Sequence, residues 1–194
     1  MSKNINIDIL LTAAEETLKS GECTPMLIVS FTKSGEPVEG VVLLPMPPHG
    51  MDRGTLMWRL GANMQSGMPN LTEVAFCADT WVAELAPEDT CGIRPGSIAD
   101  MPSAEEALAI TAYDLETGNT RDIIRRYKRD VTLERTKIKF GKIERSENKT
   151  VPTLLLYLES GYKGDSAGEA HSKVTIAHEK MKERIREKTE KKSV

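Results

Sequence analysis

Cysteine and aromatic residues are scarce in this chain of 194 residues, and long apolar runs are absent. The three cysteines (Cys23, Cys77 and Cys91) are odd in number and far apart, which argues against a disulfide framework and indicates a reducing, cytoplasmic setting. No run approaches the roughly 18 apolar residues of a membrane span. Asp8 and Glu15 interrupt the first apolar stretch, so we expect no secretory signal and no membrane contact.

Recognisable catalytic and cofactor motifs are also absent. The chain has no GxxxxGK[ST], GxGxxG or GxSxG motif, and neither CxxC nor HExxH occurs. Histidine occurs three times, and His171 and His178 are seven residues apart rather than the four of a helical metal pair. We therefore name no catalytic residue, no cofactor and no metal ligand.

An unrecognised enzyme stays open as an alternative. Its site would lie under two segments rich in proline, glycine and aspartate, residues 45–54 and 86–104. Nineteen residues is long for a connection without regular structure, which is typical of mobile or functional loops. The pocket would require the fold to bring together His49, Asp52, Arg53 and Asp79.

Charge is present in quantity but is unevenly distributed. The net charge is −3, yet residues 1–120 carry 6 Lys and Arg against 17 Asp and Glu. Residues 121–145 carry 10 against 4, and residues 171–194 carry 8 against 4. An acidic body is therefore followed by a basic block and a basic tail, an asymmetry that points to interaction surfaces.

The order of periodic segments predicts an α+β fold, with a mainly antiparallel, meandering sheet, an N-terminal helix, a short middle helix and a charged C-terminal helix. Residues 7–20 have the apolar spacing of a helix, with Asn6 as N-cap and Gly21 after its end. Further helices are expected over residues 55–65 and 171–192. Strands are expected over 26–33, 38–45, 71–85, the two arms of a hairpin at 106–130, 135–145 and 150–162.

One domain is expected over residues 1–163, followed by a linker at 164–170 and a charged helix or tail at 171–194. We expect the helices to cover one face of the sheet, and Trp81 to pack in its core. Pro152 is expected at the start or edge of a strand, because proline cannot donate to a ladder.

The segment LTEVAFCADTWVAEL, the acidic loop after it and SAEEALAITAYDLETG together resemble a group of uncharacterised prokaryotic cytoplasmic proteins. The resemblance covers about residues 24–120 and includes a tryptophan near the end of one strand. It implies a compact cytoplasmic α+β domain and transfers no functional residue.

The decapeptide RDIIRRYKRD at 121–130 has five basic residues and no cleanly apolar side, which indicates an edge strand or a protruding arm. Basic residues interleaved with aromatics could bind nucleic-acid phosphates and bases. The alternative is that carboxylates on the preceding strands, such as Glu73 and Asp79, pair with these residues and use up part of the basic charge. The candidates for nucleic-acid binding are Arg121, Arg125, Arg126, Tyr127, Lys128, Arg129, Lys137 and Lys139.

Protein binding or self-association is the function that we favour from the sequence, with nucleic-acid binding as the alternative. Residues 46–68 are rich in methionine, which is typical both of adaptable binding surfaces and of irregular cores. The C-terminal helix has a thin apolar seam at heptad spacing. The candidates for protein binding are Met51, Met57, Trp58, Met64, Met181 and Ile185.

Overall fold

The protein is an α+β domain built on one six-stranded antiparallel sheet. The computed structural model describes residues 5–21, 25–33, 36–44, 46–47, 50–68, 70–83, 98–131, 136–148 and 151–190. The strands lie in the order β2-β1-β3-β4-β5-β6. Their bounds are β1 Met26–Lys33, β2 Glu36–Leu43, β3 Leu71–Val82, β4 Glu105–Asp114, β5 Thr120–Val131 and β6 Thr136–Asn148.

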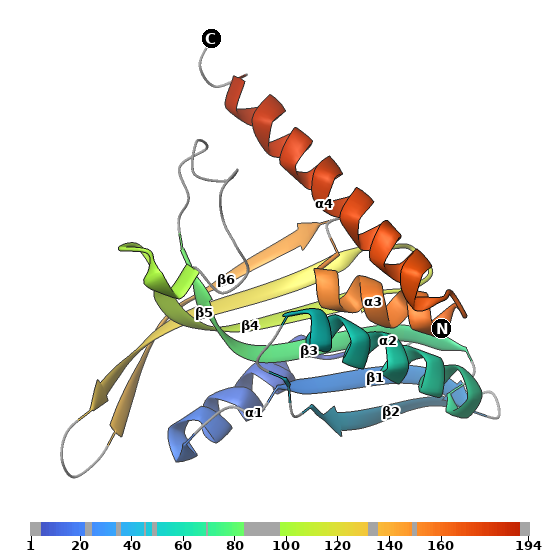
Figure 1. The fold of residues 1–194 in the computed structure, drawn as a ribbon. Coiled ribbons are helices and arrows are strands. Elements are labelled where there is room, and N and C mark those ends of the chain that lie inside the picture. The colour runs from blue at the N-terminus through green and yellow to red at the C-terminus, as the bar shows by residue number, and fades with distance from the viewer. Residues whose placement is uncertain are drawn as a thin grey trace.

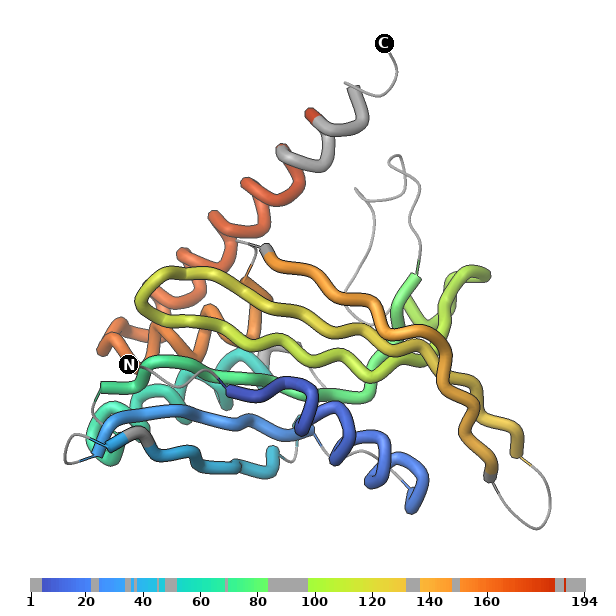
Figure 2. The backbone as a smooth tube through the Cα atoms, turned by 180° about the vertical axis from the view of Figure 1, so that it is seen from behind, coloured from blue at the N-terminus to red at the C-terminus, as the bar shows by residue number. Residues whose placement is uncertain are grey.

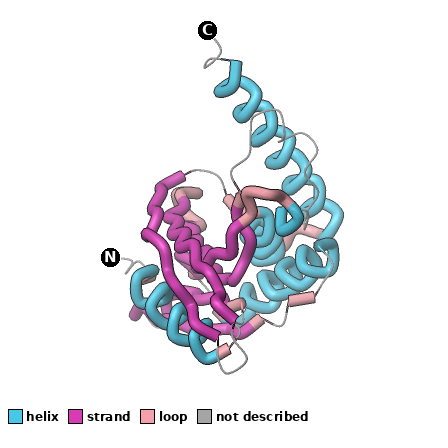
Figure 3. Tube along the Cα trace, turned by 90° about the vertical axis from the view of Figure 1, so that its left-hand side faces the viewer, coloured by secondary structure: helices cyan, strands magenta, loops and turns pink. Residues whose placement is uncertain are grey.

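Helices cover both faces of this curved sheet, where we had expected one covered face (Figures 1 and 3). Helix α1 (Ile7–Ser20) packs on one face, over β3 to β6. Helices α2 (Gly50–Gly67) and α3 (Thr153–Tyr162) pack on the other face, over β1 and β3. Figure 2 shows from behind how α1 crosses the sheet. Because strand side chains alternate between faces, β1, β3 and β4 each contribute to two separate apolar cores.

Helix α1 begins and ends as its sequence predicts. Asn6 Oδ1 accepts hydrogen bonds from the backbone N–H groups of Asp8 and Ile9, so it caps the N-terminus. Gly21 ends the helix with a φ of 155°, in the region that favours glycine. The buried side of the helix is formed by Ile7, Leu10, Leu11, Ala14 and Leu18.

Helix α2 is longer than the sequence suggested, and α3 was expected as a strand. Residues 50–54 form the first turns of α2, although we had placed them in an irregular loop. Residues 153–162 form a helix, so Pro152 precedes a helix instead of starting a strand. The leucines of α3 favour a helix, and the glycines of α2 and α3 permit a close crossing that local propensity does not reveal.

The β4–β5 hairpin has the predicted turn. Asp114 Oδ1 accepts hydrogen bonds from the backbone of Glu116 and Thr117, and Gly118 adopts a φ of 72°. Strand β5 then lies between β4 and β6, so it is not an edge strand. Its pairing with β4 ends at Arg126, whereas its pairing with β6 continues to Val131. This distal end forms an arm that extends beyond the body (Figures 1 and 2).

Helix α4 (Ala167–Glu190) starts inside the stretch that we had expected to be a linker. Ser166 and Glu169 form a capping box, in which Glu169 Oε2 accepts from the Ser166 backbone N–H at 2.8 Å. The Ser166 hydroxyl in turn accepts from the Glu169 N–H at 3.3 Å. Ala170 and Val174 are buried, so the first turns of the helix belong to the domain.

Candidate functional site

The arginines of β5 that share a face with α1 are neutralised by carboxylates. Arg121 Nη2 lies 2.7 Å from Glu73 Oε1, and Arg125 pairs with Glu15 of α1. The expectation that Glu73 uses up basic charge is therefore confirmed. Glu73 belongs to β3, two strands away from β5, and Glu15 belongs to α1. Pairing with these carboxylates leaves the two guanidinium groups with little charge to offer a ligand.

Glu73 is almost fully buried, and both of its carboxylate oxygens have partners. Its Oε2 accepts from the Ile5 backbone N–H at 2.6 Å, and Arg121 Nη2 donates to the Ile5 carbonyl at 3.0 Å. The pair thus fastens the segment before α1 to the sheet. A buried ion pair with its hydrogen bonds satisfied specifies one arrangement of the chain, which explains a glutamate on a core face.

The presence of Asp79 in strand β3 is likewise explained by contacts that stabilise the fold. Its carboxylate accepts from the Tyr127 hydroxyl, and its Oδ2 lies 2.7 Å from Arg129 Nη2. Arg129 Nε also lies 2.9 Å from Glu106 Oε1. Burial, and then the hydrogen bond to Asp79, raise the pKa of Tyr127 well above its usual value. Tyr127 is buried and packs edge-on against the partly buried Phe140, so the Tyr127 ring is no stacking platform for bases.

The opposite face of β5 and β6 has a different charge balance. Arg126 bridges two carboxylates, with Nε 3.2 Å from Glu105 Oε2 and Nη1 paired to Glu144. Lys128 reaches Glu105 only at 3.8 Å. The exposed amines of three β6 lysines have no hydrogen bond or ion pair within the described part of the chain: Lys137, Lys139 and Lys142.

A hollow of about 550 Å³ lies where β3, β4 and β5 approach the segment 98–104. Trp81 lines it and is 44% exposed, so it does not pack in the core as we had expected. Arg129 and Glu106 also line the hollow, but they pair with each other. The described residues contain no group of three or more side chains suited to a metal ion.

The described residues do not support the enzyme pocket that we left open. Asp79 faces α1, whereas Asp52 and Arg53 belong to α2 on the other side of the sheet. The Arg53 side chain instead donates to the Pro47 carbonyl at 2.6 Å. His49 and most of the loop 86–104 lie outside the described residues.

The methionine-rich segment is mostly core. Met57 and Met64 are buried between α2, α3 and the sheet, so they are not on a binding surface. Trp58 is half-buried and its Nε1 donates to the Asp165 carbonyl at 2.9 Å. The side chain of Met51 lies outside the described residues. Methionine here fills an irregular core, which was the alternative reading of the sequence.

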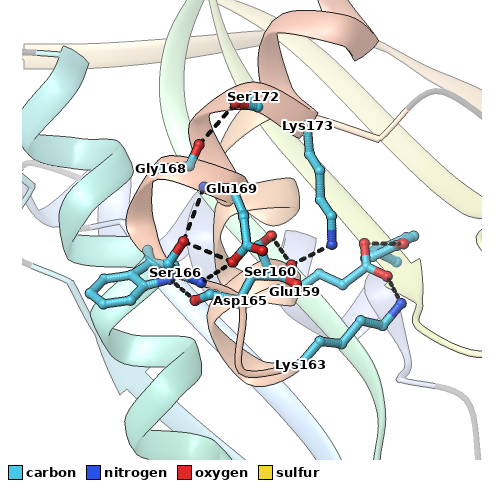
Figure 4. A network of polar contacts seen from close by, with 11 residues as sticks. Glu159, Ser160, Lys163, Asp165, Ser166, Gly168, Glu169, Ser172 and Lys173 are labelled. Carbon is cyan, nitrogen blue, oxygen red and sulfur yellow. Dashed lines mark hydrogen bonds and ion pairs between the residues drawn. The ribbon is translucent and has the colours of Figure 1, made fainter.

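A polar network fastens the start of α4 to α3 (Figure 4). Lys173 Nζ lies 2.5 Å from Asp165 Oδ2, which also accepts from the Ser160 hydroxyl. These contacts, Lys173 first, lower the pKa of Asp165. The two histidines complete the attachment: His171 Nδ1 lies 2.9 Å from the Tyr157 hydroxyl, and His178 Nε2 lies 2.6 Å from Thr153 Oγ1.

Beyond His178, α4 leaves the body of the protein (Figures 1 and 3). Met181, on the predicted apolar seam, is 40% exposed. The side chain of Ile185, the next seam residue, lies outside the described part. Lys182 flanks the seam, and its only ion pair in the described chain is with Glu179 on the same helix, at 2.8 Å.

An open apolar face is the feature that the sequence analysis missed. Val41 and Leu43 of the edge strand β2 are 63% and 62% exposed. They lie opposite Ile28 and Met26 of β1, on the α1 side of the sheet, but α1 packs over β3 to β6 instead. The alternation in VEGVVLL puts both side chains on one face; only the position of α1 shows that this face is uncovered.

Comparison with protein families, with curated proteins and with solved structures gives no match. The resemblance of residues 24–120 to uncharacterised prokaryotic proteins stays a prediction. None of the helices in the described ranges is both long and apolar enough to cross a membrane.

Proposed function

We propose that the protein is a non-catalytic binding domain that associates with a second copy of itself. The observation that carries this proposal is the β2 end of the β1–β2 face, where Val41 and Leu43 lie side by side and largely exposed, next to the buried Ile28 of β1. Apolar side chains clustered on an exposed face favour association, because burial removes their surface from water.

The occupant that fits this face is the projecting half of α4 from the second copy. Glu39 is exposed and shares the face with Val41 and Leu43. Two such faces in contact would bring like charges together, whereas Met181 with Lys182 offers an apolar residue beside a cation. The acidic balance of residues 1–120 and the basic balance of residues 171–194 favour the same pairing.

A two-fold dimer can make this contact twice, each α4 reaching the β1–β2 face of the other copy. Closed two-fold assemblies are the commonest oligomers, and closure prevents filament growth. In the described sheet, strand β2 has one free edge, and its sequence includes Pro37 and Glu39. Proline and charged residues on an edge strand discourage pairing with a strand of another molecule. Docking is therefore expected through the face and not through the strand edge.

The test is the molar mass in solution, measured by light scattering after size-exclusion chromatography across a range of concentrations. We expect a dimer that the exchange Val41→Lys dissociates. The matched control is Val131→Lys on β5, because Val131 is 71% exposed and lies away from this face. A monomer at all concentrations, or equal effects of the two variants, would overturn the proposal.

Exchanging the charges of Glu39 and Lys182 tests whether α4 is the segment that binds the β1–β2 face. Glu39→Lys and Lys182→Glu are each expected to weaken the dimer, and the double variant is expected to restore it. A dimer that responds to Val41→Lys but to neither charge variant would support association through the face and exclude α4 as its occupant. Glu39 is exposed and the Lys182 side chain is 44% exposed, so neither substitution touches the core.

A further inference from the structure

The β5–β6 arm carries a set of lysines that the ion pairs of the β5 arginines do not neutralise. All four β5 arginines have carboxylate partners, on one face or the other. Lys139 and Lys142, in contrast, have no partner in the described part of the chain. The lysines beside the decapeptide are therefore better candidates for binding an anion than its arginines are.

Lys128 and Lys139 lie directly opposite each other in the β5–β6 register. Like charges in this position destabilise a sheet. The Lys128 side chain is 81% exposed and its carboxylate contact, with Glu105, is long at 3.8 Å. The repulsion between the two amines is unfavourable in the unliganded protein, and an anion bound between them would relieve it.

A β-bulge brings a third lysine to the same place. The register shifts between Arg125 and Tyr127, so that Gly141 and Lys142 together oppose Arg126. The strands approach closely here: a Cβ added at Gly141 would lie 3.2 Å from the Arg126 carbonyl oxygen. Bulges redirect side chains, and this one places Lys142 beside the opposed pair.

These lysines line one hollow of about 310 Å³ on the arm. Arg126 lines it as well, together with the two carboxylates that it binds, Glu105 and Glu144. The carboxylates are thus already engaged by a guanidinium group, and the three amines remain. The aromatic rings of Tyr127 and Phe140 pack in the core on the α1 side.

We propose that this hollow binds the phosphate groups of a nucleic-acid backbone through Lys128, Lys139 and Lys142. An open, solvated site of flexible amines holds a single anion weakly, so a useful affinity requires several phosphates on one chain. The two aromatic rings at the hollow, Tyr127 and Phe140, are buried and partly buried against the α1-side core, so the contacts are mainly to phosphate and binding is expected to be independent of base sequence. This surface is distinct from the β1–β2 face, so the two proposals fail or hold separately.

The experiment is a fluorescence-anisotropy titration of the full chain with labelled single-stranded RNA and with labelled double-stranded DNA, at several salt concentrations. The hollow variant combines Lys128→Gln, Lys139→Gln and Lys142→Gln. The matched variant removes the same charge from residues outside the arm and outside α4, with Lys33→Gln, Arg59→Gln and Lys163→Gln. Inorganic polyphosphate serves as the third ligand, because it has the phosphates without the nucleosides.

We expect salt-sensitive binding of at least one nucleic acid, with the slope of log affinity against log salt reduced by about 2 in the hollow variant for single strands. The matched variant should retain most of the slope. No binding at low salt, equal loss in both variants, or binding of polyphosphate alone would overturn the proposal. The repulsion between Lys128 and Lys139 can be tested by itself. Lys139→Gln should raise the melting temperature of the unliganded protein, and a lower melting temperature would contradict the repulsion.

Discussion

Gly61 of α2 and Gly161 of α3 lie at the point where the two helices cross, each against the backbone of the other. A Cβ at Gly61 would lie 2.0 Å from the Leu158 carbonyl oxygen, and one at Gly161 would lie 2.0 Å from the Trp58 carbonyl oxygen. No rotation of a side chain can relieve such a contact, because the obstructing atoms belong to the backbone. The pair therefore sets the distance between the helices.

Replacing either glycine by alanine is expected to lower the free energy of unfolding by about 3 kcal/mol or more, since the helices must separate. The matched control is Gly67→Ala, also in α2, where an added Cβ meets nothing within 4 Å. That substitution should stabilise by up to about 1 kcal/mol through helix propensity. Urea unfolding of the three variants measures the contrast, and equal effects would contradict the close crossing.

Glu73→Ala is expected to cost about 3 to 5 kcal/mol, because it leaves the Arg121 guanidinium and the Ile5 N–H without their buried acceptor. Glu144→Ala removes an ion pair of comparable type from the exposed face and should cost no more than about 1 kcal/mol. Chemical denaturation distinguishes the two. A small loss for Glu73→Ala would show that the buried ion pair is not needed.

Asp165 is expected to make stability depend on pH in acid. Its folded pKa lies below the unfolded value of about 3.9, so its contribution is complete above that pH and is lost as pH falls through the folded pKa. Asp165→Asn should therefore cost about 1 kcal/mol at neutral pH, a modest figure because solvent screens the site. The difference from wild type should shrink as pH falls below the unfolded pKa; a difference that stays constant from neutral pH into acid would contradict the assignment.

The capping box of α4 gives a fourth prediction. Ser166→Ala removes the hydroxyl that accepts from the Glu169 N–H and should cost about 1 kcal/mol. Ser166→Asp is the matched control and should retain most of the stability, since aspartate also caps helices. Thermal unfolding followed by circular dichroism measures both variants. Equal melting temperatures for wild type and Ser166→Ala would show that the cap contributes nothing.

The elements with strong local signals could be predicted from the sequence. Helix α1 has its cap at Asn6 and its end at Gly21, and the β4–β5 hairpin has its turn between Asp114 and Gly118. The helical start at Ser166 also has a sequence signature, the pattern SAGE, which our linker interpretation overlooked. Local hydrogen bonds and backbone preferences fix these features, and such interactions need no distant partner.

Contacts between distant segments decided the rest. The segment 153–162 is a helix whose close crossing with α2 depends on Gly61 and Gly161, which are a hundred residues apart. The arginines of β5 lost their candidate role because the register of the sheet and the position of α1 place carboxylates beside them. Composition alone determined that the chain has an acidic body and a basic block. Only the tertiary structure determined which charges are neutralised, and that Val41, Leu43, Lys139 and Lys142 remain exposed, because burial and pairing depend on which strands and helices become neighbours.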